Sequence, residues 1–183
     1  PNLFRIFSVV TLAASVSVVS CSNPTPEVQE VQATPATLAL STETHLSNIK
    51  QLTFSGQNAE AYFSADGSRL IFQSMDGDDQ CDQIFTMRPD GSERTLVGTG
   101  KGANTCSYVY PDNQSILYAS TQQGGDACPP RPGMENGYVW AIYDEFDIFR
   151  ANIDGTNPVR LTTNSGYDAE ATIGNDGHIV FTS

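Results

Sequence analysis

Four carboxylates stand close together in the segment MDGDDQCD at residues 75–82 and could hold a cation. They are Asp76, Asp78, Asp79 and Asp82. Calcium takes six or more oxygen ligands, and this segment could supply several of them. The segment lacks the glycine and the terminal glutamate of an EF-hand loop, so a solvated acidic loop is the alternative. Calcium is the one cofactor that the sequence suggests, and we otherwise expect none.

Cysteine and aromatic side chains are the other candidates for a functional role. Cys81, Cys106 and Cys128 could supply one disulfide or a zinc site, but no CxxC motif and no nearby histidine support zinc. The stretch at 124–145 carries the only tryptophan, Trp140, together with Tyr138 and Tyr143. These aromatics are candidates to contact a ligand or partner, sugars included. The alternative is that they pack down on the strands beneath them.

Catalytic motifs are missing from the sequence. No GxSxG nucleophile motif occurs, and no glycine-rich phosphate loop opens a helix. The two histidines, His45 and His178, fall in a polar N-terminal stretch and beside a turn. We therefore expect this chain to catalyse no reaction. With 9 Lys and Arg against 21 Asp and Glu, its net charge of −12 also argues against nucleic-acid binding.

The elements that would position these side chains are short strands joined by Asp-Gly turns. The segments AYFSADGSRLIFQS at 61–74 and ATIGNDGHIVFTS at 171–183 both indicate a strand, a tight turn and a second strand. We expect two-residue turns, for which Asp-Gly supplies the positive φ angles. The apolar runs RLIF, SILY and HIVF indicate strands that are buried on both faces.

The hairpins recur in order along the chain. Asp66, Asp112 and Asp176 occupy one place in the repeat, with spacings of 46 and 64 residues, and Asp90 and Asp154 occupy a second place. The longer spacing contains the insertion at 124–145. Four short strands in a unit of about 45 residues are typical of a β-propeller blade.

The pattern F-S-x-D-G-x-x-(L/I)-x-F-x-S, then (D/Q)-I-F, D-G and L-T resembles the PD40 or TolB-like propeller repeat. The resemblance covers residues 49–183 and implies an all-β propeller of four-stranded blades, at 51–95, 96–160 and an incomplete 161–183. Two and a half blades cannot close a ring, which needs about four to eight. We therefore expect an N-terminal fragment of a closed propeller.

In propellers of this kind the first strand of each blade lines the channel, and its start shares one rim with the loop between the second and third strands. The resemblance places Glu60, Cys106 and Glu170 at aligned rim positions. The carboxylates of Glu60 and Glu170 could face a ligand, or they could be solvated rim charge. Because the three later cysteines lie toward this rim, we expect Cys81 to pair with Cys106, with Cys128 as the alternative partner.

The N-terminus resembles a bacterial lipoprotein signal. Fourteen uncharged residues at 6–19 follow Arg5, and VVSC at 18–21 resembles a lipobox whose Cys21 becomes the acylated first residue. An ordinary cleaved signal peptide and an uncleaved anchor are the alternatives. Residues 1–20 are thus expected to be a signal peptide and 21–48 a Pro- and Thr-rich tether. By the same resemblance, Ser22 favours the outer membrane.

These features together predict a lipid-anchored cell-envelope propeller that binds a protein or peptide at its rim, like TolB proteins. Its partners would be that protein or peptide and, through the lipid on Cys21, a membrane. The alternative is the N-terminal propeller of a secreted peptidase of the prolyl-oligopeptidase or dipeptidyl-peptidase type, with a catalytic domain beyond residue 183.

Overall fold

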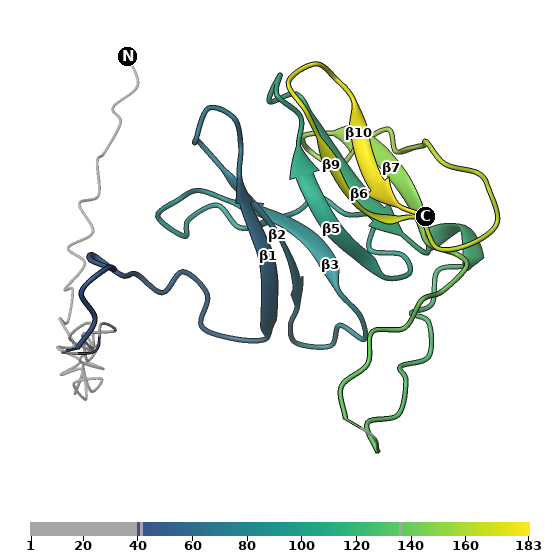
Figure 1. The fold of residues 1–183 in the computed structure, drawn as a ribbon, viewed down its shortest axis with the longest axis horizontal. Helices are drawn as coiled ribbons and strands as arrows, with labels where there is room; N and C mark the ends of the chain where they lie inside the picture. Colours follow the sequence, from purple (N-terminus) through teal and green to yellow (C-terminus); the bar gives the residue numbers. More distant parts are fainter. Residues whose placement is uncertain (1–39, 41, 136) are drawn as a thin grey trace, which may run out of the picture. The chain divides into compact units, whose positions relative to one another are not determined.

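Strands and loops make up nearly all of the fold, and the strands lie in three antiparallel sheets (Figure 1). The computed structural model describes residues 40, 42–135 and 137–183. The first sheet contains β1 (Gln57–Phe63), β2 (Leu70–Met75), β3 (Gln83–Met87) and β4 (Thr95–Leu96). The second contains β5 (Asn104–Val109), β6 (Ser115–Ser120), β7 (Asp147–Asn152) and β8 (Val159–Arg160). The third pairs β9 (Ala169–Ile173) with β10 (Ile179–Thr182), and a short 3-10 turn, η1 (Gln122–Gly124), follows β6.

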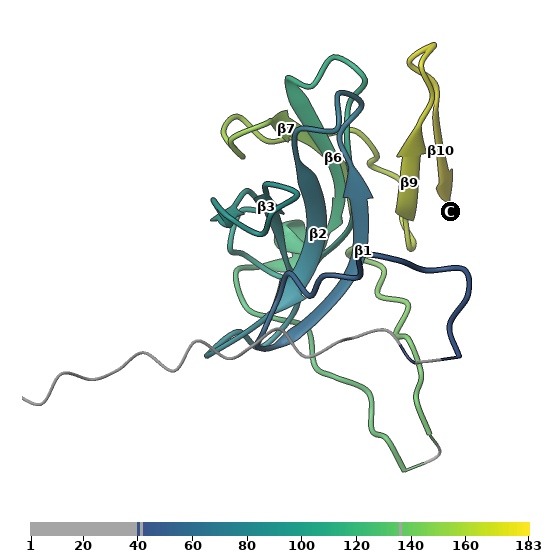
Figure 2. The same ribbon diagram turned by 90° about the vertical axis from the view of Figure 1, so that its left-hand side faces the viewer.

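The predicted fold class is confirmed: the chain is all-β, with two four-stranded blades and the first two strands of a third. Successive strands are hydrogen-bonded neighbours, and the sheets lie side by side as layers (Figure 2). The predicted signal peptide at 1–20 and Cys21 lie outside the described residues, as does most of the tether at 21–48. Within the described part of the chain, no helix has the length and apolar character needed to span a membrane.

The five hairpins that have an Asp in the turn share one kind of turn, and it is longer than predicted. In each turn the residue after the Asp donates its N–H to the carbonyl three residues earlier, at 2.8 to 2.9 Å. Only that residue has a positive φ, for example 69° at Gly67 and 57° at Asn113, so the prediction of two-residue turns is wrong. The Asp instead accepts, through Oδ1, the N–H two residues further on, at 2.8 to 3.1 Å. The Asp side chain thus replaces a backbone acceptor at the turn.

The first core lies between the first and second sheets. Ile71 on β2 and Ile84 on β3 pack against Ile116 and Tyr118 on β6, and these four side chains are completely buried. The neighbours Leu70 and Phe72 on β2 point to the other face, where Leu52 and Phe85 pack against them. Because successive side chains of a strand alternate between faces, the apolar run in β2 buries both.

The second core lies between the second sheet and β9. Leu117 and Ala119 on β6 pack against Ala169 and Ala171 on β9. The run SILY is therefore buried on both faces, as predicted. The run HIVF is not, because Val180 on β10 is 68% exposed. Burying a side chain such as Leu117 contributes roughly 1.5–3 kcal/mol, so these two layers supply much of the stability.

Candidate functional site

The three aligned rim positions adopt one unusual backbone conformation. Glu60 on β1, Cys106 on β5 and Glu170 on β9 have φ angles of 50°, 52° and 57°. At each of them the register with the second strand shifts by a β-bulge. A residue with a side chain is rarely left-handed, and bulges re-aim side chains next to binding sites. The first strand of every blade therefore carries a bulge at the same place.

Gln73 on β2 holds the bulge of the second sheet in place. Its Oε1 accepts the backbone N–H of Cys106 at 3.1 Å and also the hydroxyl of Thr105. Both donors and the acceptor are buried. A buried N–H without a partner would cost about 1–3 kcal/mol, so this glutamine fixes the bulge to the neighbouring blade.

Cys106 lies between the other two bulge residues. It is a free, buried cysteine. Burial raises the pKa of its thiol to about 12, and the negative charge of Glu60 adds to the rise. The Thr105 hydroxyl, 3.3 Å from the sulfur, opposes the rise through a hydrogen bond. The thiol therefore stays protonated at neutral pH and is no nucleophile.

Tyr167 connects the bulges to the insertion. Burial raises the pKa of its phenol, the hydrogen bond from Trp140 opposes the rise, and Glu170 and Glu60 add to it. The indole Nε1–H of Trp140 donates to the phenol oxygen at 3.1 Å. Trp140 of the insertion thus meets Tyr167, which lies three residues before the bulge at Glu170.

The carboxylates of the acidic loop engage different partners within the chain. Asp76 accepts the Ser55 hydroxyl at 2.7 Å, and this hydrogen bond lowers the pKa of the Asp76 carboxyl. Asp79 accepts the N–H of Asp76 at 3.3 Å. Asp82 is half-buried, which raises the pKa of its carboxyl, while Arg131 opposes the rise. Among the described residues no group of three or more His, Cys, Asp or Glu could hold a metal ion.

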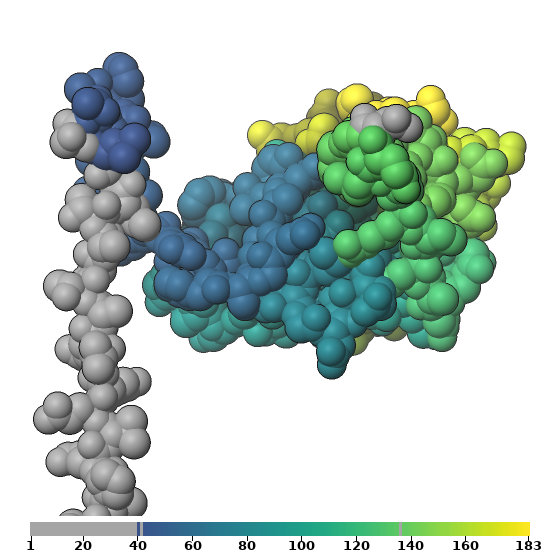
Figure 3. Space-filling model, turned by 90° about the horizontal axis from the view of Figure 1, so that it is seen from below, coloured from purple at the N-terminus to yellow at the C-terminus, as the bar shows by residue number. Residues whose placement is uncertain are grey.

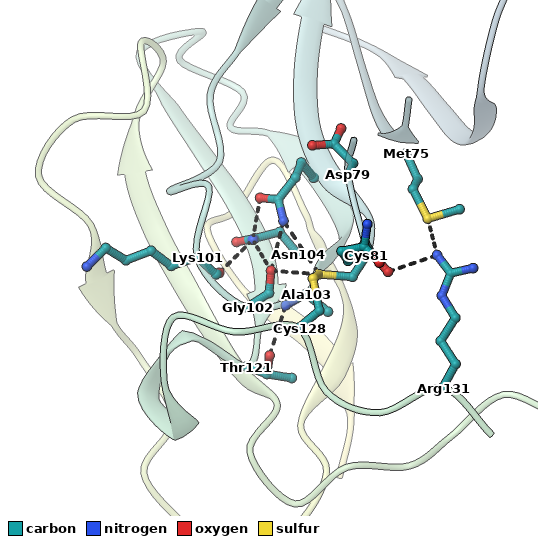
Figure 4. The surroundings of a disulfide bond; sticks show 12 residues. Met75, Asp79, Cys81, Lys101, Gly102, Ala103, Asn104, Thr121, Cys128 and Arg131 are labelled. Atoms are coloured by element: carbon teal, nitrogen blue, oxygen red, sulfur yellow. Dashed lines mark hydrogen bonds between the residues drawn. A yellow bond between two sulfur atoms is a disulfide. The ribbon is translucent and has the colours of Figure 1, made fainter. Parts of the chain in front are cut away.

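The disulfide joins Cys81 to Cys128, and the favoured pairing of Cys81 with Cys106 is wrong (Figure 4). The thiol of Cys106 is turned toward the bulges, whereas Cys81 contacts the carbonyl of Gly102 at the start of the next blade. The side chain of Gln83 donates to the same carbonyl at 2.8 Å. The disulfide therefore ties the insertion of the second blade to the β2–β3 loop of the first.

The insertion both packs down and stays open. Tyr143 stacks beside Phe146 at 6.3 Å between ring centroids, and its hydroxyl donates to the carbonyl of Pro130. Tyr138 and Trp140 are 75% and 43% exposed and line a cavity of about 370 Å³. In Figure 3 the insertion, coloured green, stands beside the blue first sheet. Tyr143 thus packs down on the strands, whereas Tyr138 and Trp140 stay accessible to solvent.

Sequence reasoning missed three residues of this site: Gln73, Arg131 and Tyr167. Tyr167 stands where the second blade has Ala103, three residues before the bulge, so the repeat gave no signal for it. Gln73 directly follows the apolar run RLIF, and its polar side chain gave no signal of this role. Arg131 reaches the carbonyl of Gln80, 51 residues earlier, and only the folded chain brings the two together.

Two solved structures share this fold. The structure of a putative TolB from Agrobacterium tumefaciens is 22% identical, with a TM-score of 0.52 over 71% of this chain and 39% of its own. The crystal structure of TolB from Acinetobacter baumannii is 20% identical, with a TM-score of 0.52 over 71% of this chain and 28% of its own. No family model and no curated protein matches the chain. At this identity the similarity establishes the fold, that of part of a TolB β-propeller, and this chain spans 39% and 28% of those two.

Proposed function

We propose that this chain is the binding part of a TolB-like propeller and receives a protein or peptide segment at the face formed by its bulged first strands. One observation carries the proposal: the neighbouring first strands β1, β5 and β9 carry Glu60, Cys106 and Glu170 at equivalent bulges, each with a left-handed backbone. Repeated strain at equivalent positions persists only where the surroundings enforce it, and such sites are often functional.

The chemistry of this face is that of recognition. Glu60 and Glu170 supply carboxylates, and Tyr167 and Trp140 supply aromatic surface with a hydrogen-bonded edge. Cys106 offers no thiolate, because the pKa of its thiol is about 12. Carboxylates beside aromatic rings suit a polypeptide that carries positive charge.

The compartment in this proposal is the cell envelope. The Cys81–Cys128 disulfide supports it, since such bonds persist in oxidising compartments. Attachment to the outer membrane through a lipid on Cys21 belongs to the same proposal and rests on the VVSC motif. Mass spectrometry of the N-terminal peptide from the native host tests the lipid: an unmodified Cys21 would refute the anchor and leave the binding face untouched.

The binding role is tested by selecting displayed random dodecapeptides on the purified chain. We expect the enriched peptides to bind Glu60→Gln and Glu170→Gln more weakly than the unaltered chain, as measured by calorimetry. Glu93→Gln is the matched control: it removes one charge from the β3–β4 turn, at the opposite end of the first sheet from the β2–β3 loop. Failure to enrich any peptide, or equal affinity for all three variants, would overturn the proposal.

A further inference from the structure

Two hollows lie on the two sides of residues 129–131, directly beside the disulfide. One has a volume of about 370 Å³ and the other about 660 Å³. They share Cys81, Pro129 and Arg131 in their walls, so they adjoin each other beside the insertion. Ligand pockets commonly have volumes of about 300–1,000 Å³. Both hollows therefore have the size of a site for a few side chains.

The smaller hollow is lined mainly by apolar and aromatic side chains, with Asp82 and Arg131 also in its walls. Met75 and Phe146 belong to its walls, together with Met134, Tyr138 and Trp140 from the insertion. The three insertion side chains are 61%, 75% and 43% exposed, although side chains of this size normally avoid water. Tyrosine, tryptophan and methionine are enriched in the central contacts of protein interfaces. This hollow therefore suits an apolar or aromatic side chain.

The larger hollow is acidic. Asp78, Asp79 and Asp126 line it, against the single guanidinium of Arg131. That guanidinium is already engaged, because Arg131 donates to the carbonyl of Gln80 at 2.9 Å and contacts the sulfur of Met75 (Figure 4). Asp126 is paired with Lys101 at 3.1 Å. The carboxylates of Asp78 and Asp79 are left to attract a cation from outside.

We infer that the two hollows together bind one extended peptide segment in which an apolar or aromatic side chain adjoins a lysine or arginine. The apolar side chain enters beside Tyr138 and Trp140, and the cationic side chain lies against Asp78 and Asp79. Charge complementarity supports this occupant, because the chain carries −12 and the acidic hollow has two carboxylates to spare. The inference rests on the proposed function and names the chemistry of its partner.

The disulfide gives the site its shape. Cys128 fixes the start of residues 129–131 to Cys81, which contributes to the walls of both hollows. The N–H of Gly102, just before β5 in the same blade, donates to the carbonyl of Asp126 at 3.0 Å and holds the insertion two residues before Cys128. Reduction should release the insertion and separate the aromatic wall from the acidic one, so binding should be lost in dithiothreitol.

Trp140 provides the readout, because it is the only tryptophan in the chain and lines the apolar hollow. The probe is an unlabelled pentapeptide of glycine, lysine, leucine, lysine and glycine, titrated while tryptophan emission is recorded. We expect a saturable shift in emission that weakens with salt. A peptide with glutamate in place of both lysines, and one with serine in place of leucine, should each bind at least roughly tenfold more weakly.

Variants locate the site. Asp78→Asn and Asp79→Asn should each weaken binding by roughly twofold to fivefold, the range of exposed ion pairs. Tyr138→Ala should weaken it by roughly fivefold or more. Glu93→Gln should leave the affinity unchanged. Tyr138 is exposed, so its loss should not unfold the chain, and circular dichroism checks that.

The outcomes separate this inference from the proposed function. If the pentapeptide leaves the emission unchanged, or binds equally well with glutamate in place of lysine, the inference is overturned. The proposed function stands in that case if dodecapeptides selected on the chain still lose affinity in Glu60→Gln. A shift produced by oligosaccharides and by none of the peptides would also overturn the inference, and would assign the hollow to sugars.

Discussion

The two junctions between neighbouring sheets differ at one equivalent position. Gln73 on β2 and Ala119 on β6 each pair with the residue just before the bulge of their own sheet, Ala59 and Thr105. Gln73 reaches across the first junction to the bulge of the second sheet. Ala119 carries no side-chain acceptor, so it cannot make the equivalent hydrogen bond to the bulge of β9.

The difference shows two ways of fixing one blade against the next. At the first junction, directional hydrogen bonds between buried groups set the position of the bulge. At the second junction, Ala119, Ala169 and Ala171 allow close packing of small side chains. The repeat therefore specifies the sheets, while single residues that break the repeat decide how each junction is held.

The sharpest test compares Ile71→Ala at the first junction with Leu117→Ala at the second, because both side chains are fully buried at equivalent places. Each should cost about 2–5 kcal/mol of unfolding free energy. We expect the cost at Ile71 to be larger, since four-stranded sheets enclose it on both sides, whereas the two-stranded sheet over Leu117 can collapse. Urea denaturation of both variants measures the difference. Equal costs would mean that the two junctions are equally rigid.

Gln73→Ala tests the directional junction. It leaves the N–H of Cys106 and the hydroxyl of Thr105 without their buried acceptor, at a cost of about 1–3 kcal/mol. Amide hydrogen exchange at Cys106 should accelerate, whereas Thr172 on β9 should exchange as before. Unchanged exchange at Cys106 would show that packing alone holds this bulge.

The smallest expected effect is on the pH dependence of stability. It compares Asp66 in a hairpin turn with Asp82 in the acidic loop. Hydrogen bonds, led by the N–H of Ser68, lower the pKa of Asp66, so its stabilisation is present above the ordinary Asp pKa of about 3.9 and is lost in acid. Burial raises the pKa of Asp82, so the stability linked to its protonation is complete in acid and is lost as pH rises.

Asp66→Ala should therefore destabilise the chain at pH 7, whereas Asp82→Asn should stabilise it. The difference in stability between each variant and the unaltered chain should shrink as the pH falls toward 3. Thermal unfolding across this range measures both variants against the unaltered chain. A destabilising Asp82→Asn at pH 7 would show that its attraction to Arg131 outweighs the cost of burial.

Much of the scaffold could be predicted because its signals are local. An Asp side chain can accept the backbone N–H two residues further on. Where the residue directly after the Asp tolerates a positive φ, the chain makes this turn. Apolar runs such as RLIF and SILY predicted buried strands for the same reason. The predicted length of the turns was wrong, because Asp-Gly also suits two-residue hairpins. Only the folded backbone shows that the Asp side chain acts as a hydrogen-bond acceptor in the turn.

The sequence by itself determined the order of strands, the places of the turns and the alignment of Glu60, Cys106 and Glu170. Only the tertiary structure decided which cysteine joins Cys81, that Tyr167 and Trp140 meet, and that Gln73 serves a neighbouring blade. The physical reason is distance along the chain: turns depend on residues a few positions apart, whereas these contacts join residues 27 to 47 positions apart. Such contacts depend on how whole sheets stack, which no short stretch of sequence encodes.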